Sequence, residues 1–417
     1  MNAGEDGGSR SLDVGRRKVP LNTHVHLPPN FSAFRDTREA VRRASDEGLG
    51  VLGASNYYDF AVYAELATRS REAGIVPLFG MEAICYLPDL REAGVRINDP
   101  GNPGKMYLCG KGLVRFDPMA DEAAARMDVL IRVDGERIRA LVERMSQVFA
   151  DAGVEVRVSV DGVVAAVAER AGVPSGTVHL QERHVAQAFA EALPGALERL
   201  TGAAPAALDP VNVQNVLRSQ LMKAGKPAYV AEDDAIDFDL VRGLVLALGG
   251  IPCYPVLADG ASPVCGFESS VADLASWLRA HGVHAAELIP NRNAPDVLTR
   301  YVRGLRDAGL VVTAGTEHNT LDMVPMTPVC ADGSALPAEV QEVFWEGVCV
   351  LAAHQARVGR GEPGFVGADG APDPTYSSDD ERITAWARAG AGLIQAELTR
   401  RPTDHAAAPA AEGLAPR

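Results

Sequence analysis

Pro20-Leu21-Asn22-Thr23-His24-Val25-His26-Leu27 is the stretch that decides the fold, because it sets two histidines one residue apart at the end of an apolar run. Side chains at positions i and i+2 of a strand point to the same face. Both imidazoles can therefore reach one cation, and neutral imidazole suits zinc, iron, nickel or copper. A surface His-x-His on an ordinary strand has the same pattern, so the rest of the chain must decide between the two interpretations.

Composition limits the class of protein. The length of 417 residues suits one large α/β barrel with additions, or two to three smaller domains. A net charge of -15 argues against broad contact with nucleic acid or an anionic membrane, so we expect no nucleic acid beyond a nucleotide-sized ligand. Six cysteines without a C-x-x-C pair indicate reduced thiols and a cytoplasmic location. Residues 1–17 lack the apolar core of a signal peptide, and no later stretch resembles a membrane span.

After the histidine pair the pattern follows the β-α-β-α-β order of a parallel sheet. Asp36 is expected to cap the first helix, with Glu39 as its capping-box partner. Strands are expected at 50–54 and 75–82. The chemistry of such sheets and barrels lies where strands end and loops begin. Three successive strand ends carry polar groups here, namely His24 with His26, Asn56 to Asp59, and Glu82.

The parallel pattern is interrupted from about Phe116 to Ala235, where helical periodicity predicts an insertion that covers the strand ends as a cap. Strands resume at 251–255, 285–289 and 310–314. We therefore predict an α/β barrel with a helical cap inserted after its third strand. The expected divisions are a flexible tail at 1–17, the barrel at 18–115 and 236–360, the cap at 116–235, and a partly disordered extension at 361–417.

With these elements placed, the chain resembles the polymerase and histidinol phosphatase (PHP) superfamily of metal-dependent phosphoesterases. The resemblance is to the branch whose distorted (β/α)7 barrel carries an inserted helical domain. It rests on motifs that follow the family's order from about Leu21 to Asn319. The motifs are His24-Val25-His26, Gly80-Met81-Glu82, Arg183-His184-Val185-Ala186, Gly225-Lys226-Pro227-Ala228-Tyr229-Val230, Gly249-Gly250 before Tyr254-Pro255, and Thr313-Ala314-Gly315-Thr316-Glu317.

The chain departs from that family at several histidine positions. The departures are Tyr57 where the family's second strand ends in Thr-Asp-His, Tyr107 before Gly110, Tyr254-Pro255 in place of His-Pro, and Gly315-Thr316-Glu317-His318-Asn319 in place of Gly-Ser-Asp-x-His. The resemblance implies three metal positions. Its first position is intact as His24, His26, Glu82 and Glu317, whereas the other two need histidines that are absent. Neutral phenol is a poor metal ligand near pH 7.

The resulting prediction is about one divalent transition metal per chain, namely zinc, manganese or iron. The candidate ligands are His24, His26, Glu82, Glu317 and His318. The candidate catalytic groups are Tyr57, Tyr254 and Asp59. The phenols of the two tyrosines can donate hydrogen bonds to a substrate or an oxyanion. The candidate substrate-binding residues are Tyr107, Arg183, His184, Asn291, Arg292 and Asn319, with arginine able to hold an anion bidentately.

Several of these residues have a plainer interpretation. Glu82 is also consistent with a helix-capping carboxylate, and His184 with a capping or core role at a helix start. Lys105, Lys111 and Arg292 could hold an anionic group, although such cations are more often solvated on the surface.

Together these features favour a metal-dependent hydrolase of phosphoesterase type that acts on a small anionic metabolite with a metal-activated water. The enzyme alternative is a one-metal hydrolase, isomerase or lyase whose substrate is not a phosphate ester. The third alternative is a barrel that has lost catalysis and only binds a ligand. Three phenols at histidine positions favour altered chemistry, because random loss would leave assorted residues. Substrate, metal identity and oligomeric state stay open.

Overall fold

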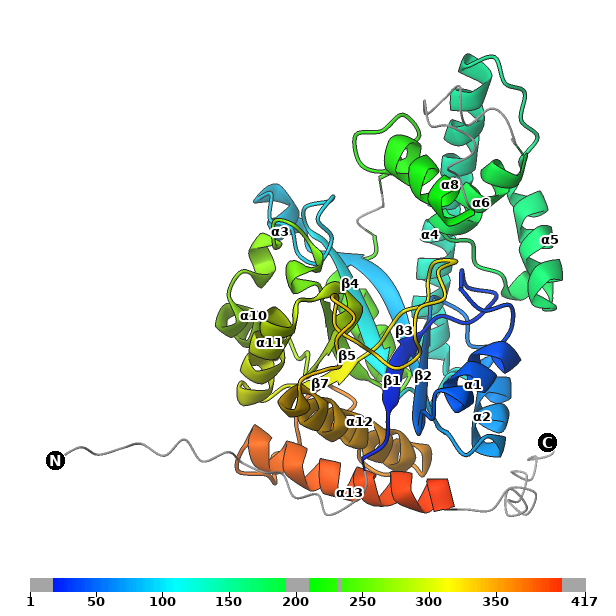
Figure 1. The fold of residues 1–417 in the computed structure, drawn as a ribbon. Coiled ribbons are helices and arrows are strands. Elements are labelled where there is room, and N and C mark those ends of the chain that lie inside the picture. The colour runs from blue at the N-terminus through cyan, green and yellow to red at the C-terminus, as the bar shows by residue number, and fades with distance from the viewer. Residues whose placement is uncertain (1–17, 193–209, 232–234, 400–417) are drawn as a thin grey trace.

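The computed structural model describes residues 18–192, 210–231 and 235–399, so the predicted tail at 1–17 and the end of the chain from residue 400 lie outside it. Seven strands form one sheet in chain order, curled into a nearly closed barrel with helices outside (Figure 1). They are β1 (Leu21–Val25), β2 (Val51–Asn56), β3 (Val76–Tyr86), β4 (Lys105–Lys111), β5 (Ile251–Val256), β6 (Ala285–Leu288) and β7 (Val311–Ala314). The prediction of a seven-stranded α/β barrel is confirmed.

β4 is the strand that breaks the parallel pattern. β1 to β3 pair parallel, as do β5 to β7. β4 runs antiparallel to both neighbours, with Glu82 opposite Cys109 and Cys109 opposite Cys253. The prediction that the cap follows the third strand is therefore wrong, because the helical insertion follows β4. The sequence conceals this strand because Lys105 and Lys111, its first and last residues, leave only a short apolar run between them, although both lysines are buried.

The barrel helices cover the outside of the sheet. They are α1 (Thr37–Asp46), α2 (Tyr63–Glu72), α3 (Pro88–Glu92), α9 (Phe238–Ala247), α10 (Val271–Ala280), α11 (Pro295–Asp307), α12 (Ala338–Gly359) and α13 (Asp379–Thr399). α12 packs on β7, and α13 packs on α12 (Figure 1). Asp36 caps α1 as predicted, by accepting a hydrogen bond from the Glu39 N–H at 2.7 Å. The Glu39 carboxylate accepts in return from the N–H of Arg35 rather than from that of Asp36.

Barrel closure depends on the segment after β7. A β-carbon on Gly315 would lie 2.2 Å from the β-carbon of His24, so only glycine lets the chain pass this close to β1. Glu317 and His318 then take positive φ angles of 62° and 51°. The Glu317 N–H donates to the His24 carbonyl, and the His26 N–H donates to the Glu317 carbonyl, both at 2.8 Å. The barrel is thus closed by strained backbone at the histidine pair, and such strain is concentrated at functional sites.

The insertion has a hydrophobic core of its own. It comprises α4 (Asp121–Asp151), α5 (Val160–Ala171), α6 (Glu182–Ala192), α8 (Pro210–Leu217) and a π-helical turn (Arg218–Met222). Ile138 and Phe149 of α4 are buried there, and Phe149 stacks on Phe189. The first half of α4, with Met127 and Val133, packs instead in the barrel core. One continuous helix therefore belongs to both cores and runs from the barrel into the insertion (Figure 1).

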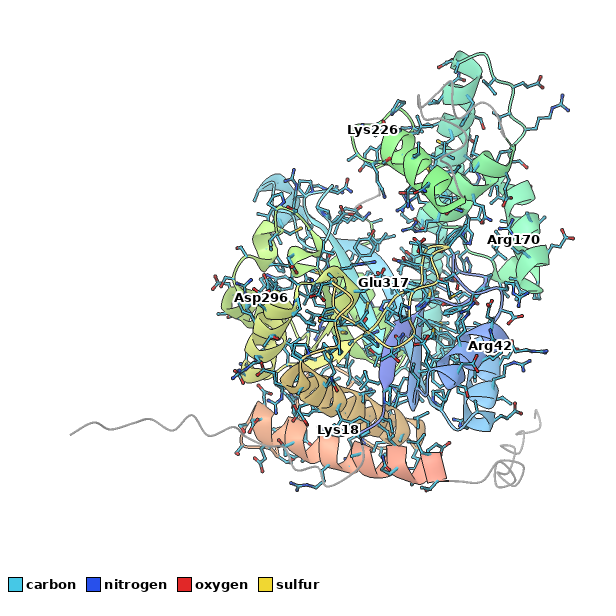
Figure 2. The ribbon with its side chains drawn as sticks, viewed as in Figure 1. Lys18, Arg42, Arg170, Lys226, Asp296 and Glu317 are labelled. Atoms are coloured by element: carbon cyan, nitrogen blue, oxygen red, sulfur yellow. The ribbon has the colours of Figure 1, made fainter. Side chains whose placement is uncertain are left out.

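Charged side chains such as Arg42, Arg170 and Asp296 project from the helices into solvent (Figure 2). A smaller set of charged groups is buried inside the barrel, including Lys111 and Glu287. None of the helices in the described parts of the chain is both long and apolar enough to cross a bilayer. All six cysteines belong to the described residues and none forms a disulfide.

Candidate metal centre and its cavity

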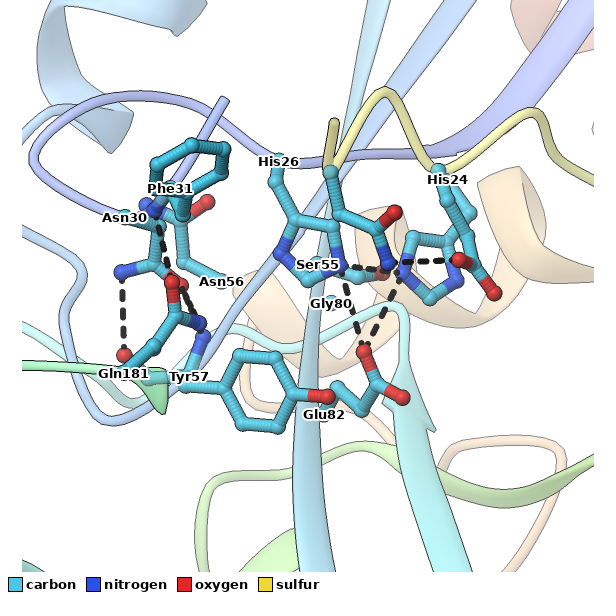
Figure 3. A network of polar contacts seen from close by, with 12 residues as sticks. His24, His26, Asn30, Phe31, Ser55, Asn56, Tyr57, Gly80, Glu82 and Gln181 are labelled. Atoms are coloured by element: carbon cyan, nitrogen blue, oxygen red, sulfur yellow. Dashed lines mark hydrogen bonds and ion pairs between the residues drawn. The ribbon is translucent and has the colours of Figure 1, made fainter. Parts of the chain in front are cut away.

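Three predicted ligands converge on one point, His24 from β1, His26 directly after it, and Glu82 from β3 (Figure 3). The two Nε2 atoms are 3.3 Å apart. Oε2 of Glu82 lies 3.2 Å from Nε2 of His26 and 3.7 Å from Nε2 of His24. Ligand atoms about 2.1 Å from a tetrahedral zinc ion stand about 3.4 Å from one another. The spacing of these three atoms therefore fits a single metal ion.

The surroundings of this triad (His24, His26 and Glu82) also suit a cation. The three side chains are buried, and within the described part of the chain Oε2 of Glu82 forms no hydrogen bond. Although burial opposes ionisation, the two histidines lower the pKa of Glu82 well below its ordinary value. A buried, ionised carboxylate is costly unless positive charge lies beside it, and a metal ion held by the two imidazoles would supply that charge. Two imidazoles and one carboxylate are a donor set typical of zinc and iron enzymes.

Behind His24 lies a buried ion pair that sequence analysis did not assign to the site. Oε2 of Glu287, in β6, lies 2.5 Å from Nδ1 of His24 and accepts a hydrogen bond from it. Nζ of Lys111, in β4, lies 2.7 Å from Oε1 of Glu287 and also donates to Ser55 and to the carbonyl of Thr23. With Nδ1 of His24 bound to Glu287, Nε2 is the ring nitrogen that faces the triad and would bind a metal ion.

The same ion pair explains the local electrostatics. Burial alone would raise the pKa of Glu287, but the Lys111 ammonium outweighs it and lowers that pKa to about 2. Burial and Lys111 both oppose protonation of His24, yet Glu287 raises the pKa of His24 to about 9. Cys109 also lies near His24 and Glu287. We do not regard that group as a second metal site, because Lys111 already neutralises the carboxylate and burial raises the pKa of the thiol.

Tyr57 is the predicted catalytic group that does face the triad. Its ring stacks on His26, with 5.4 Å between ring centroids and 10° between planes. Its hydroxyl lies beside the Glu82 carboxylate (Figure 3). Burial first, and Glu82 second, raise the pKa of Tyr57 well above its ordinary value. The phenol is therefore neutral near pH 7 and can donate a hydrogen bond.

A cavity of about 580 Å³ opens beside the triad, between the barrel and the insertion. Aromatic rings and charged groups of both signs line it. The rings are Phe31, Tyr57, Tyr58 and Tyr107; the cations are Lys105, Arg137, Arg183, Arg218, Lys223 and Arg292; the carboxylates are Glu82, Asp99, Asp134, Glu182 and Glu317. Burial raises the pKa of Tyr107 to about 12, so it is a second neutral phenol in the cavity.

Arg183 differs from the other cavity cations. The ion pairs are Lys105 with Asp99, Arg137 with Asp134, Arg218 and Lys223 with Glu182, and Arg292 with Glu317. Within residues 18–192, 210–231 and 235–399, Arg183 forms no such pair. Burial, and then Arg218, lower the pKa of Arg183 to about 10, which leaves it charged near pH 7. Its guanidinium is thus available to an anionic ligand.

Glu317 is held in a different arrangement from the one predicted. Arg292 binds both of its carboxylate oxygens, with a distance of 2.9 Å between Nη1 and Oε1. Asn319 donates to the same carboxylate at 2.6 Å. All three residues line the cavity, but Glu317 does not join the triad. Its role as a metal ligand stays a prediction.

The structure does not bring His318, a predicted metal ligand, to the triad. Its Nδ1 pairs with the hydroxyl of Thr316 at 2.7 Å, and its Nε2 pairs with the carbonyl of Val324 at 3.0 Å. The ring stacks on Phe34, with centroids 4.7 Å apart. Both ring nitrogens are therefore occupied away from the triad, and burial lowers the pKa of His318 to about 4.

Tyr254, a predicted catalytic group, does not face the triad in this structure. Its hydroxyl donates to Oε1 of the buried Glu268 at 2.8 Å, and its ring contacts Phe267. Cys253 lies opposite Cys109 of β4, whose thiol lies near His24 inside the barrel. Because successive side chains of a strand face opposite ways, Tyr254 must point outward into the helical layer. It reaches neither Glu82 nor solvent.

Three other candidates do not line the cavity. Asp59 accepts a hydrogen bond from the N–H of Ala61, and burial raises its pKa to about 6. Asn291 has a buried side-chain oxygen without a partner in the described part of the chain. His184 accepts a hydrogen bond from the N–H of Gln181, directly before α6, so it has the capping role that the sequence left open. None of the three supports a direct role in binding or catalysis.

Comparison with known proteins agrees with this architecture at the level of fold. No family model matches the chain, and no curated protein matches it. A structure from Bifidobacterium adolescentis described as a metal-dependent phosphoesterase matches with a TM-score of 0.54 and 17% identity, over 79% of this chain and 96% of that one. An amidohydrolase from Chromobacterium violaceum, with bound sulfate and no metal, matches with a TM-score of 0.51 and 17% identity, over 78% and 96%. The chain shares the fold of these two proteins.

The outward position of Tyr254 gives a testable result. Tyr254→Phe removes one hydrogen bond to a buried carboxyl group, so we expect the free energy of unfolding to fall by about 1–2 kcal/mol. Metal content should not change, because the hydroxyl does not contact the triad. Urea unfolding and elemental analysis of the same preparation check both parts. A Tyr254→Phe protein that lost its metal would place the hydroxyl at the centre after all.

Proposed function

We propose that this protein is a metal-dependent hydrolase of phosphoesterase type, similar to the PHP superfamily, that acts on a small anionic metabolite. The observation that carries the proposal is the convergence of His24, His26 and Glu82 at the wall of a cavity that also presents Arg183, which pairs with no carboxylate among the described residues. The descriptions of the two structural neighbours are in keeping with hydrolase chemistry.

In this proposal each group has one role. His24, His26 and Glu82 hold one zinc, manganese or iron ion, and Glu287 fixes the proton of His24 on Nδ1. When bound, such an ion supplies Lewis acidity that polarises a substrate oxygen. Tyr57 donates its hydroxyl hydrogen to a substrate oxygen beside Glu82. Arg183 pairs with the anionic group of the substrate.

A second candidate is a one-metal hydrolase whose substrate is an amide, a lactone or a sugar derivative. The observation that favours it is the number of metal sites. Two clusters among the described residues have the spacing of metal ligands, and of these only the triad has a carboxylate that is not already paired with an ammonium. The phosphoesterase resemblance, by contrast, implies three metal positions. We also propose a cytoplasmic location, which the six reduced cysteines support.

The test is a hydrolase screen on protein stripped of metal and reloaded with zinc, manganese or iron(II). We expect release of inorganic phosphate from at least one class of small phosphate ester, only with metal present. Arg183→Met should raise KM for that substrate by roughly 10- to 100-fold, because the hydrogen bond between the charged guanidinium and the anionic group of the substrate is lost. The metal content should not change. Arg157→Met is the matched control, since Arg157 is 89% exposed on the insertion.

The remaining outcomes separate the alternatives. Metal-dependent cleavage of neutral amides or lactones, without cleavage of phosphate esters, would favour the second candidate. Tight ligand binding without turnover on any class would identify a binding protein. Phosphate release that persists without metal would overturn the proposed function.

A further inference from the structure

Gln181 joins the insertion to the loop that follows the histidine pair (Figure 3). It lies directly before α6, and its side-chain oxygen accepts a hydrogen bond from the N–H of Phe31 at 2.7 Å. Its side-chain nitrogen donates to Oδ1 of Asn30 at 3.3 Å. The ring of Phe31 also packs edge-on against His184 of α6, with centroids 5.3 Å apart. The insertion and the barrel therefore meet here through a polar contact supported by an apolar one.

Asn30 extends this contact to Tyr57. Its Nδ2 donates to the carbonyl of Tyr57 at 3.2 Å, and its Oδ1 accepts from the N–H of Tyr57 at 2.7 Å. Asn30 is 3% exposed, so its amide has no water to replace these partners. The same Oδ1 accepts from both Gln181 and Tyr57. Any rotation of Asn30 that loses Gln181 therefore also disturbs both backbone bonds to Tyr57.

Tyr57 is the residue whose ring stacks on His26 and whose hydroxyl lies beside Glu82. We infer that Gln181 is a positioning residue of this site, which acts through Asn30 to hold the Tyr57 phenol against the metal centre. The insertion thereby contributes to the geometry of the barrel site through one amide side chain. The inference rests on the proposed function for the role of the phenol, but the contacts that carry it do not depend on the reaction.

Hydrogen exchange at single amides, measured on the full chain, tests the structural part. Gln181→Ala should speed exchange of the Phe31 and Tyr57 amides by roughly fivefold to tenfold, as expected for the loss of about one hydrogen bond. Gln181→Glu keeps the acceptor for Phe31 but cannot donate to Asn30, so it should speed exchange at Tyr57 alone. Gln187→Ala, whose side chain bonds Glu191 on the same helix, is the matched control and should change neither. Unchanged exchange at Tyr57 in both Gln181 variants would overturn the inference.

A double-mutant cycle tests the link to the site. The readout is the affinity of the zinc-loaded protein for inorganic phosphate. Gln181→Ala should weaken this affinity by roughly tenfold in the wild-type background and not at all in a Tyr57→Phe background, because the phenol that it positions is already gone. Equal weakening in both backgrounds would overturn the inference, since Gln181 would then act on the anion directly from the cavity wall. If wild-type protein binds no phosphate, the proposed function fails, and the exchange measurement still decides the role of Gln181.

Discussion

A chain that carries His26→Ala should fold normally and purify without its metal, whereas the wild-type chain should hold about one tightly bound transition metal ion. Nε2 of His26 lies 3.2 Å from Oε2 of Glu82 and 3.3 Å from Nε2 of His24, so its removal takes away one of three converging ligand atoms. Loss of a group that only orients a ligand lowers metal affinity roughly 10- to 100-fold. Loss of a ligand itself should exceed that range.

Elemental analysis and competition with a chromogenic chelator measure this effect, and thermal unfolding monitors the fold. His281→Ala is a suitable control, because His281 is exposed on the outside of the barrel, stacked on Trp277. The control should keep its metal. A His26→Ala chain with wild-type metal content would show that the triad is structural. Three metals per wild-type chain would contradict the single centre.

Lys111→Met should be the most destabilising single substitution near the site. It leaves the Glu287 carboxylate at 0% exposure without its ammonium partner, and breaking a buried pair from one side costs about 3–5 kcal/mol. Lys226→Met, on the exposed side of the insertion (Figure 2), should change stability by less than about 0.5 kcal/mol. Chemical denaturation of the two variants side by side makes the comparison.

The double variant Lys111→Met/Glu287→Leu separates stability from metal binding. Replacing both charges with apolar side chains should restore most of the lost stability, because no buried charge is left alone. Nδ1 of His24 then loses its hydrogen-bond acceptor, so the metal affinity of the double variant should be roughly 10- to 100-fold lower than that of the wild type. A double variant with wild-type metal affinity would show that Glu287 does not orient His24.

The triad was predictable because its information is local. Two histidines at a spacing of two on a strand face the same way, and Glu82 lies in β3, the second strand along from β1 in the parallel part of the sheet. The Lys111–Glu287 pair was not predictable in the same way, since its members come from strands that lie far apart in the chain. One signal was present, however. A single charged residue inside an apolar barrel strand requires a buried partner of opposite charge.

The direction in which some side chains point was also not predictable from the sequence. Nothing local indicates which of Cys253 and Tyr254 faces the barrel interior, because β5 is buried on both sides and its pattern does not alternate. The antiparallel β4 sets that choice by placing Cys109 opposite Cys253. Similarly, the left-handed backbone at His318, which no sequence motif revealed, accompanies a ring whose partners all lie away from the triad.

The helix that the two cores share limits how the insertion can move. Val133 of α4 is packed in the barrel and Ile138 in the insertion, and Gly135 lies between them. A β-carbon at Gly135 would meet nothing within 4 Å, so packing does not require glycine there. A glycine inside a helix nevertheless destabilises that helix by roughly 0.5–1 kcal/mol relative to alanine. We therefore expect α4 to bend at Gly135, which would act as a hinge about which the insertion tilts as one body. The cavity mouth should widen or narrow as the helix bends. Gly135→Ala should stiffen the hinge and slow ligand entry, and entry rates equal to wild type would place the flexible point elsewhere.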